Sequence, residues 1–197
     1  AAQLVAHRKI DIKEPGHPQH LDFLAISAHK IYAPFGLGVL ITDRGMFKEG
    51  DPDIVGGGTV DLVSEDYAYW TDAPEKEEAG TPNVAGAIAL AKALSIIMDI
   101  GMDKIAAHEA ELTRYALQKL KKISGLIFYG SLNEDEVDKR LGVISFNVKD
   151  KPHALVGAIL NYEGGIGVRN GCFCAHPYVK CLLGVTVEEV KVLEEKI

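Results

Sequence analysis

The stretch that decides the fold runs from Ser27 to Leu40 and reads SAHKIYAPFGLGVL. Apolar runs at 21–26 and 38–41 lie on either side of a polar turn, and they predict two short, mostly buried strands. The polar residues 27–30 follow the first run directly, so Lys30 is expected at the exit of a strand. A lysine in this place is either an ordinary exposed charge or a nucleophile that loses its proton through partial burial beside another cation.

The same string resembles the lysine motif of class V aminotransferases and cysteine desulfurases, which depend on pyridoxal phosphate. Their pattern is Ser-x-His-Lys-x-x-Gly-Pro-x-Gly-x-Gly, and Ala33 stands here where the pattern has the glycine before proline. The resemblance implies that Lys30 carries the cofactor as a Schiff base and that Ser27 and His29 bind its phosphate. Hydroxyl and imidazole N–H groups are good donors to phosphate.

Two further segments resemble the same family. The opening AAQLVAH is similar to the family's Asp-x-Ala-Gln segment, which implies that Gln3 contacts the cofactor's phenolic oxygen; the aspartate that pairs with the pyridine nitrogen would lie just before this stretch. By themselves, Gln3 and His7 indicate only a terminal amide and a surface histidine. Residues 78–83, EAGTPN, match a motif whose threonine reaches the phosphate held by the other subunit. Thr81 therefore implies a homodimer with shared sites.

Residues 164–177, GGIGVRNGCFCAHP, resemble the family segment that carries the desulfurase nucleophile. Cys174 aligns with that nucleophile, which takes sulfur from a cofactor-bound cysteine and becomes a persulfide. This chemistry needs a thiolate, which the positive charges of Arg169 and His176 nearby would favour. Arg169 also suits the carboxylate of an amino-acid substrate, because a planar guanidinium binds a carboxylate through two hydrogen bonds.

Two other interpretations of the cysteine cluster stay open. Cys172, Cys174, His176 and Cys181 include enough ligand types for zinc, but their spacing, Cys-x-Cys-x-His-x4-Cys, is not one of the usual zinc patterns. No metal site is therefore predicted. Alternatively, the cysteines are only small, partly buried residues in a turn, because class V enzymes with other activities can carry a cysteine here.

Composition narrows the class of protein. The 197 residues are 47% hydrophobic and contain 21 Lys and Arg against 28 Asp and Glu, which gives a net charge of −7. This balance argues against a broad nucleic-acid surface, and no apolar run approaches the ~20 residues that cross a bilayer, so no membrane partner is expected. Three cysteines make no disulfide framework in a chain of this length, and this favours a reducing compartment such as the cytoplasm.

Two long helices are predicted in the middle of the chain. The first covers 84–100, with Thr81 as the capping hydroxyl, Pro82 at the first helical position and Gly101 as the stop. The second covers 103–123 and ends at Gly125. Its apolar face is expected to hold Ile105, Leu112, Ala116, Leu120 and Ile123.

The remainder of the second half predicts a compact α+β unit. Alternating residues at 143–148 indicate a strand, and a helix near 152–162 and a short strand at 166–169 follow. A terminal helix opens with the capping box at 186–189.

These motifs cover the chain from Gln3 to about Pro177 in the family's order, so the sequence is identified as a member of fold type I of the pyridoxal-phosphate transferases, an α/β fold. The expected division is the C-terminal portion of the large cofactor-binding domain at 1–100, followed by a small, truncated α+β domain at 101–197. Because enzymes of this family are much longer and the chain lacks an initiator methionine, we expect a fragment.

The resemblance implies a cysteine desulfurase. L-cysteine displaces Lys30 from the Schiff base, Lys30 moves protons, and Cys174 takes the sulfur, which leaves L-alanine and passes to an acceptor protein. Two alternatives are a transaminase or lyase of the same fold that acts on another amino acid, and a non-catalytic fragment that serves only in dimerisation or partner binding. The insertion at 13–20 is interpreted as a solvated loop rather than a metal site.

Overall fold

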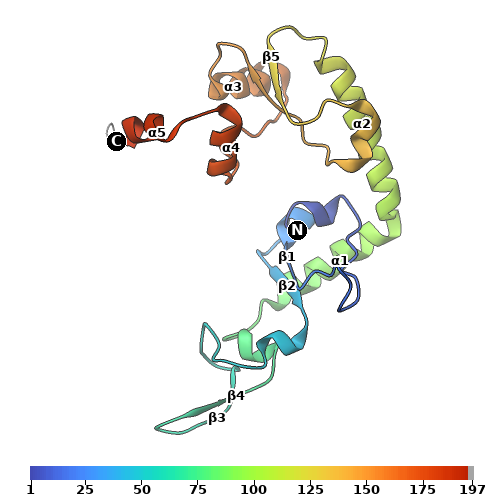
Figure 1. The fold of residues 1–197 in the computed structure, drawn as a ribbon. Coiled ribbons are helices and arrows are strands. Elements are labelled where there is room, and N and C mark those ends of the chain that lie inside the picture. Colours follow the sequence, from blue (N-terminus) through green and yellow to red (C-terminus); the bar gives the residue numbers. More distant parts are fainter. Residues whose placement is uncertain (195–197) are drawn as a thin grey trace. The chain divides into compact units, whose positions relative to one another are not determined.

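A computed structural model describes residues 1–194, which belong to two compact units (Figure 1). The first unit comprises residues 1–109 and the second begins at Ala110. Both units contain helices and strands, and the strands of the described residues form three two-stranded antiparallel sheets. The mixed α/β class is therefore confirmed, whereas the division at residue 100 stays a prediction.

The lysine turn lies between two paired strands of the first unit. β1 (Phe23–Ser27) pairs with β2 (Gly38–Thr42), and Ser27 lies opposite Gly38. A 3₁₀ helix, η2 (Ala28–Ile31), follows β1 directly, so Lys30 does follow a strand, as predicted. The strands are not mostly buried, and Leu24 is their one buried residue. A two-stranded sheet buries little because neither strand has a second neighbour.

The core of the first unit is built mainly from small side chains. It lies where η1 (Leu4–Ala6), η2 and the first long helix, α1 (Val84–Ile100), meet. The buried cluster consists of Ala6, Ala28, Ile31, Ala33, Leu90 and Ile97. Alanines permit the backbones of these short elements to approach closely, so η2 packs on α1 and η1 packs on η2.

α1 covers the predicted residues but begins with a different cap. The cap is Asn83, whose side-chain oxygen accepts a hydrogen bond from the Gly86 N–H at 2.9 Å. Its amide group also donates to the Phe35 carbonyl at 2.6 Å, so one side chain both starts the helix and holds the loop after Lys30. Pro82 and Thr81 precede the helix. Gly101 ends it with φ of +92°, as predicted.

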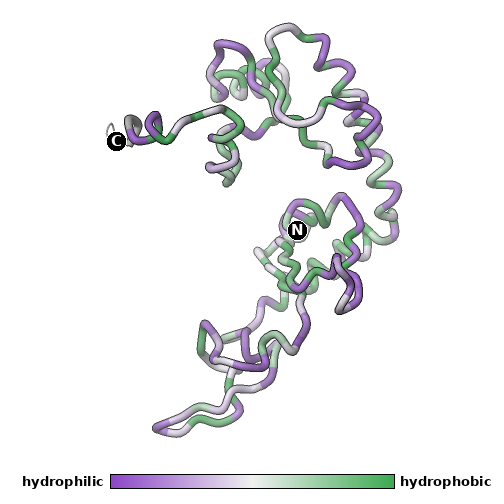
Figure 2. The backbone as a smooth tube through the Cα atoms, viewed as in Figure 1, coloured by the Kyte–Doolittle hydropathy of each residue, from purple (hydrophilic) through white to green (hydrophobic). Residues whose placement is uncertain are grey.

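α1 is hydrophobic along most of its length (Figure 2). Only Gly86, Leu90 and Ile97 are buried, whereas Ile88 and Met98 are 67% and 75% exposed. A helix that is apolar all round is normally covered on every side. Within residues 1–194, α1 therefore presents an apolar face that nothing covers.

The second long helix, α2 (Met102–Leu120), differs from the expected one in length and in its buried face. Thr113 and Leu117 are buried, whereas Leu112 is exposed. Ile105, Ala116 and Leu120 are half-buried, so the predicted face is correct in part, with Thr113 and Leu117 buried in place of Leu112. A side chain on Gly142 would meet the Thr113 hydroxyl at 3.3 Å. The segment around Gly142 therefore packs closely against Thr113 and covers this face of α2. Ile123 lies beyond the helix end and is exposed.

Among the described residues, no single helix is long and apolar enough to cross a membrane; only α1 and α2 together reach that length and hydropathy, and they bend by 74° at their junction.

A second hairpin and several short 3₁₀ helices complete the first unit. β3 (Val60–Val63) pairs with β4 (Ala68–Trp70), and neither strand was predicted. The 3₁₀ helices are η3 (Arg44–Phe47) and η4 (Glu75–Glu77).

The second unit is the predicted mixture of helices and strands, with one exception. β5 (Leu126–Tyr129) pairs with β6 (Ser145–Val148), and these are followed by α3 (His153–Gly164), α4 (His176–Leu183) and α5 (Val187–Glu194). A fifth 3₁₀ element, η5 (Glu134–Lys139), lies between the strands. Residues 166–169 form no strand, because no neighbouring strand in the described chain pairs with them.

The capping box before α5 is confirmed. The Thr186 N–H donates to the Glu189 carboxylate at 2.8 Å, and the Glu189 N–H donates to the Thr186 hydroxyl at 3.2 Å. Two N–H groups that the helix leaves without partners are thereby satisfied.

We predict that Asn83→Ala lowers the free energy of unfolding by about 1 kcal/mol or more, because the helix cap and the bond to the Phe35 carbonyl are lost together. Urea unfolding followed by circular dichroism measures this effect. Thr81→Ala serves as the matched control and leaves the unfolding free energy nearly unchanged, because Thr81 does not cap the helix. If Thr81→Ala were the more damaging change, the assignment of the cap to Asn83 would be wrong.

Candidate functional site

Lys30 lies in η2, on the turn that connects β1 to β2. Its side chain is half-buried, and its ammonium group makes no hydrogen bond or ion pair within residues 1–194. The turn closes where Ala33 N–H donates to the Ala28 carbonyl at 3.1 Å. The lysine therefore lies on a short turn that is closed by a backbone hydrogen bond, and its amine has no partner among the described residues.

Ala33 replaces a family glycine without backbone strain. It is buried, and its φ does not lie in the left-handed region, unlike that of Tyr32 and Phe35 on either side of it. Glycine is required where φ is positive, so this position does not need one. The departure from the family pattern leaves the geometry of the turn intact.

Three other predicted cofactor ligands lie near Lys30. Two of them are close in sequence, and the third precedes an element that packs on the lysine helix. Ser27 is the last residue of β1, His29 is part of η2, and Gln3 precedes η1, which packs on η2. None of the three side chains makes a hydrogen bond within the described part of the chain. The structure thus brings two short helices together with their polar groups available.

Thr81 belongs to the same unit and lies just before the start of α1. Asn83, two residues later, is bound to the loop that follows Lys30. On the other side, Gly80 N–H donates to the Gly57 carbonyl at 2.8 Å, and a side chain on Gly56 would meet Ala79 at 3.3 Å. The segment before α1 is therefore fixed between the lysine loop and the glycine turn at 56–58, and the Thr81 side chain is exposed.

The residues of the first unit fit pyridoxal phosphate by their chemistry. An amine can hold the aldehyde, two hydroxyls and an imidazole can donate to the phosphate, and an amide can donate to the phenolic oxygen. These groups belong to Lys30, Ser27, Thr81, His29 and Gln3, and none of them is engaged with another side chain in residues 1–194. Because the fold does not use these hydrogen-bond donors, they are available to bind a phosphate-bearing aldehyde.

Cys174 and Arg169 belong to the second unit. Cys174 is an exposed free thiol on a tight turn, where Phe173 and Cys174 have φ of 51° and 59°. Residues other than glycine adopt this left-handed region at a cost, so the turn is strained. Cys172 carbonyl accepts from Ala175 N–H at 2.7 Å, which closes the turn just before α4. Arg169 is exposed and makes no ion pair in the described residues.

Within residues 1–194, no three His, Cys, Asp or Glu side chains converge, in the cysteine cluster or in the histidine loop. In the loop, His20 Nδ1 lies 2.8 Å from the Lys13 carbonyl, and His17 Nδ1 accepts from Gln19 N–H at 3.0 Å. Lys13 hydrogen-bonds to Asp11 and so lowers the pKa of that carboxyl. Both histidines therefore serve the conformation of the loop.

The other shifted carboxyl also lies outside the predicted site. The hydrogen bond from Lys121, with a second from Gln118, lowers the pKa of Glu134. This contact links the end of α2 to η5 and has no part in the predicted chemistry.

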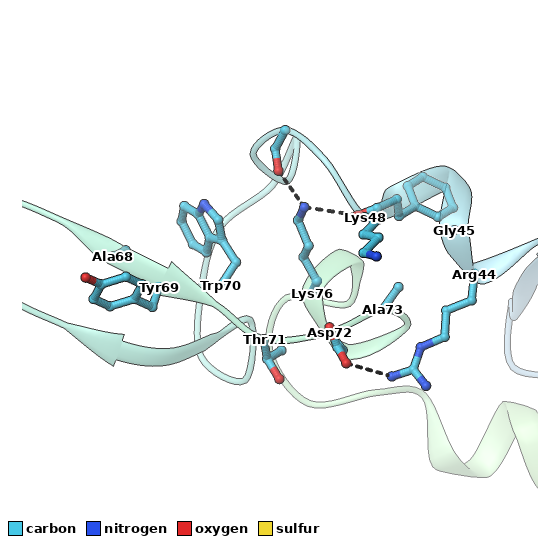
Figure 3. A pocket seen from close by; sticks show the side chains of 12 residues that line it. Arg44, Gly45, Lys48, Ala68, Tyr69, Trp70, Thr71, Asp72, Ala73 and Lys76 are labelled. Atoms are coloured by element: carbon cyan, nitrogen blue, oxygen red, sulfur yellow. Dashed lines mark hydrogen bonds and ion pairs between the residues drawn. The ribbon is translucent and has the colours of Figure 1, made fainter.

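A cavity of about 530 Å³ lies at the base of the β3–β4 hairpin (Figure 3). None of the predicted site residues lines it. The ammonium of Lys76, which is 4% exposed, donates to the carbonyls of Phe47 at 3.1 Å and Gly50 at 2.5 Å. Lys76 thus has partners of its own and fastens the 47–50 loop to η4.

Sequence reasoning missed the surroundings of His7. Instead of lying on the surface, the His7 ring is only 32% exposed and contacts Glu109 of α2. The two residues are 102 positions apart, and no local pattern indicates such a pair.

Comparison with known proteins connects these motifs to one family. The family model for class-V aminotransferases matches residues 1–186. Probable cysteine desulfurases of Halalkalibacterium halodurans and Staphylococcus aureus are 40% identical over 182 residues, which cover 92% of this chain and 42% of theirs. The chain therefore spans less than half the length of these curated relatives.

Two solved structures are similar as well. The apo cysteine desulfurase of Thermococcus onnurineus superposes with a TM-score of 0.77 at 35% identity, over 98% of this chain and 49% of that protein. The cysteine desulfurase CsdA of Escherichia coli gives a TM-score of 0.80 at 32% identity, over 94% and 43% of the two chains.

We predict that Ala33→Gly lowers the free energy of unfolding by about 1–2 kcal/mol, although glycine is the family residue, because a buried methyl group is lost and the unfolded chain gains freedom. Gly36→Ala, three residues later, is the matched exchange in the opposite direction. It also destabilises, because Gly36 has φ of +67°. Thermal and urea unfolding measure both, and a stabilising Ala33→Gly would show that the turn is strained at this position.

Proposed function

The chain belongs to the class V aminotransferase family, and from that premise we propose that it contributes to a pyridoxal-phosphate-dependent cysteine desulfurase. The observation that carries the proposal is Lys30, held at a strand exit with an unpaired amine, in a chain that is similar to cysteine desulfurases over 92% of its length. The proposed reaction converts L-cysteine to L-alanine and transfers sulfur to Cys174 as a persulfide.

The proposed cofactor ligands are those of the first unit. Lys30 holds the aldehyde, Ser27 and His29 donate to the phosphate, and Gln3 donates to the phenolic oxygen. When bound, the cofactor supplies the electron sink that allows bonds at the substrate's α-carbon to break. The Lys30 amine, once released from the aldehyde, takes and returns protons close to that carbon.

Cys174 and Arg169 would act on the substrate. The Arg169 guanidinium binds the substrate carboxylate through two hydrogen bonds. The Cys174 thiolate attacks the substrate sulfur, so that a sulfur–sulfur bond forms while the carbon–sulfur bond breaks. The electron pair stays with the substrate carbon, which gains a proton and becomes the methyl group of alanine. The exposure of Cys174 then supports transfer of the sulfur to an acceptor protein.

We further propose a homodimer in the cytoplasm. Thr81 is exposed and makes no hydrogen bond in the described residues, so it is available to the phosphate held by a second copy. The uncovered apolar face of α1 supports association with further protein. The three cysteines are free thiols, which suits a reducing compartment.

The cofactor assignment predicts a visible absorption band when the full-length protein is supplied with pyridoxal phosphate. Lys30→Ala should abolish the band, because Lys30 is the residue proposed to hold the aldehyde. Lys48→Ala, which changes an exposed lysine of the same unit, is the control and should keep the band. A wild-type protein that never acquires the band would leave only a binding or structural role.

The reaction assignment predicts a persulfide on Cys174. After incubation with L-cysteine, mass spectrometry of the full-length protein should find one added sulfur atom on the peptide that contains residues 172–174. Cys174→Ser should lose this mass and the formation of alanine but keep the visible band, whereas Cys172→Ser should keep all three. A visible band without any persulfide would favour a transaminase or lyase that acts on another amino acid.

A further inference from the structure

One carboxylate of α2 holds two consecutive residues near the N-terminus. Glu109 Oε1 lies 2.5 Å from His7 Nδ1, and Glu109 Oε2 accepts from Arg8 Nη1 at 2.7 Å. An ionised carboxylate can only accept, so His7 Nδ1 carries the proton in this contact. Both oxygens of Glu109 are thus used by neighbouring residues of one turn.

These contacts are partly shielded from water. The side chains of Arg8, Glu109 and His7 are 17%, 22% and 32% exposed. Arg8 also donates to the His7 carbonyl at 2.8 Å, which locks its side chain along the turn. Charged hydrogen bonds in such an environment contribute more than those of a fully exposed ion pair.

The turn that Glu109 holds is the one that begins at Gln3. Gln3 is the N-cap of η1, and the His7 and Arg8 N–H groups both donate to the Leu4 carbonyl, at 3.0 Å each. η1 has only three residues and buries a single one, Ala6, against the core. So short an element has little packing of its own, and it depends on contacts from outside to keep its orientation.

α2 supplies that contact from the same face that packs on the core. Met102 and Ile105 pack against the buried cluster around η2, and Glu109 follows them at helical spacing on this face. The helix therefore contacts the buried cluster through apolar side chains and the two residues that follow η1 through a carboxylate.

We propose that Glu109 is a positioning residue whose carboxylate, through His7 and Arg8, fixes the turn that carries Gln3 and so holds the Gln3 amide beside the Lys30 helix. The inference rests on the proposed function, because the place of Gln3 matters to chemistry only where Lys30 holds the cofactor. In this proposal, a carboxylate of α2 controls the position of the Gln3 amide, although the two residues are far apart in the sequence.

The test uses the full-length protein and four variants: Glu109→Gln, Glu111→Gln, Gln3→Ala and the double variant Glu109→Gln with Gln3→Ala. Glu111 is the matched control, because it lies on the same helix, is exposed and makes no hydrogen bond or ion pair in the described residues. The first measurement, without cofactor, is the side-chain amide signal of Gln3 in an ¹⁵N NMR spectrum, identified by its loss in Gln3→Ala. Glu109→Gln should shift this signal and Glu111→Gln should not.

The second measurement is the pH midpoint of the visible absorption with pyridoxal phosphate bound. Loss of the Gln3 donor disfavours the more negative form of the phenolic oxygen, so Gln3→Ala should raise the midpoint by about one pH unit. Glu109→Gln should raise it by a smaller amount, and the double variant should go no further than Gln3→Ala, because Glu109 acts only through Gln3.

The outcomes separate this inference from the proposed function. If Glu109→Gln lowers the melting temperature but leaves the Gln3 signal in place, the contact is only structural and the inference is overturned. An unchanged pH midpoint in Glu109→Gln, with a normal band in the wild type, overturns it as well. If the wild type shows no band, the proposed function fails, and the Gln3 signal by itself still decides whether Glu109 positions the turn.

Discussion

Close packing of small residues is the constraint on which the first unit depends. Ala6, Ala28 and Ala33 allow η1 to pack closely on η2 and η2 to pack on α1, in one buried cluster with Leu90 and Ile97. Larger side chains at these positions would push the elements apart, at a typical cost of about 1–3 kcal/mol per overpacked site. Because η2 carries Lys30, the same packing decides where the reactive amine lies.

Single polar side chains then orient the loop after Lys30 and the turn that begins at Gln3, which the core contacts only in part. Asn83 begins α1 and holds the loop after Lys30, and Glu109 holds the turn that begins at Gln3. Each of these side chains contacts a segment that is distant in sequence and couples it to a helix. The polar groups proposed to bind the cofactor depend on these ties, because they stand on elements too short to be rigid by themselves.

Apolar surface stays uncovered on both the sheets and the first long helix. Every sheet in the described residues has only two strands, and α1 keeps apolar side chains such as Ile88 and Met98 in contact with water. The chain also spans less than half the length of its curated relatives. The hydrophobic effect favours covering such surfaces, which is consistent with the association proposed above.

The sequence alone determined the family, the place of Lys30 after a strand, the extent of α1 and the capping box before α5, because each follows from a local pattern or a contiguous motif. Only the tertiary structure decided which residue caps α1, that Thr113 of α2 is buried while Leu112 is exposed, and that His7 pairs with Glu109. Each of these depends on a partner far along the chain: the Phe35 carbonyl at Asn83, Gly142 at Thr113 and α2 at His7. Local periodicity carries no information about such partners, because packing between distant segments selects among locally equivalent choices.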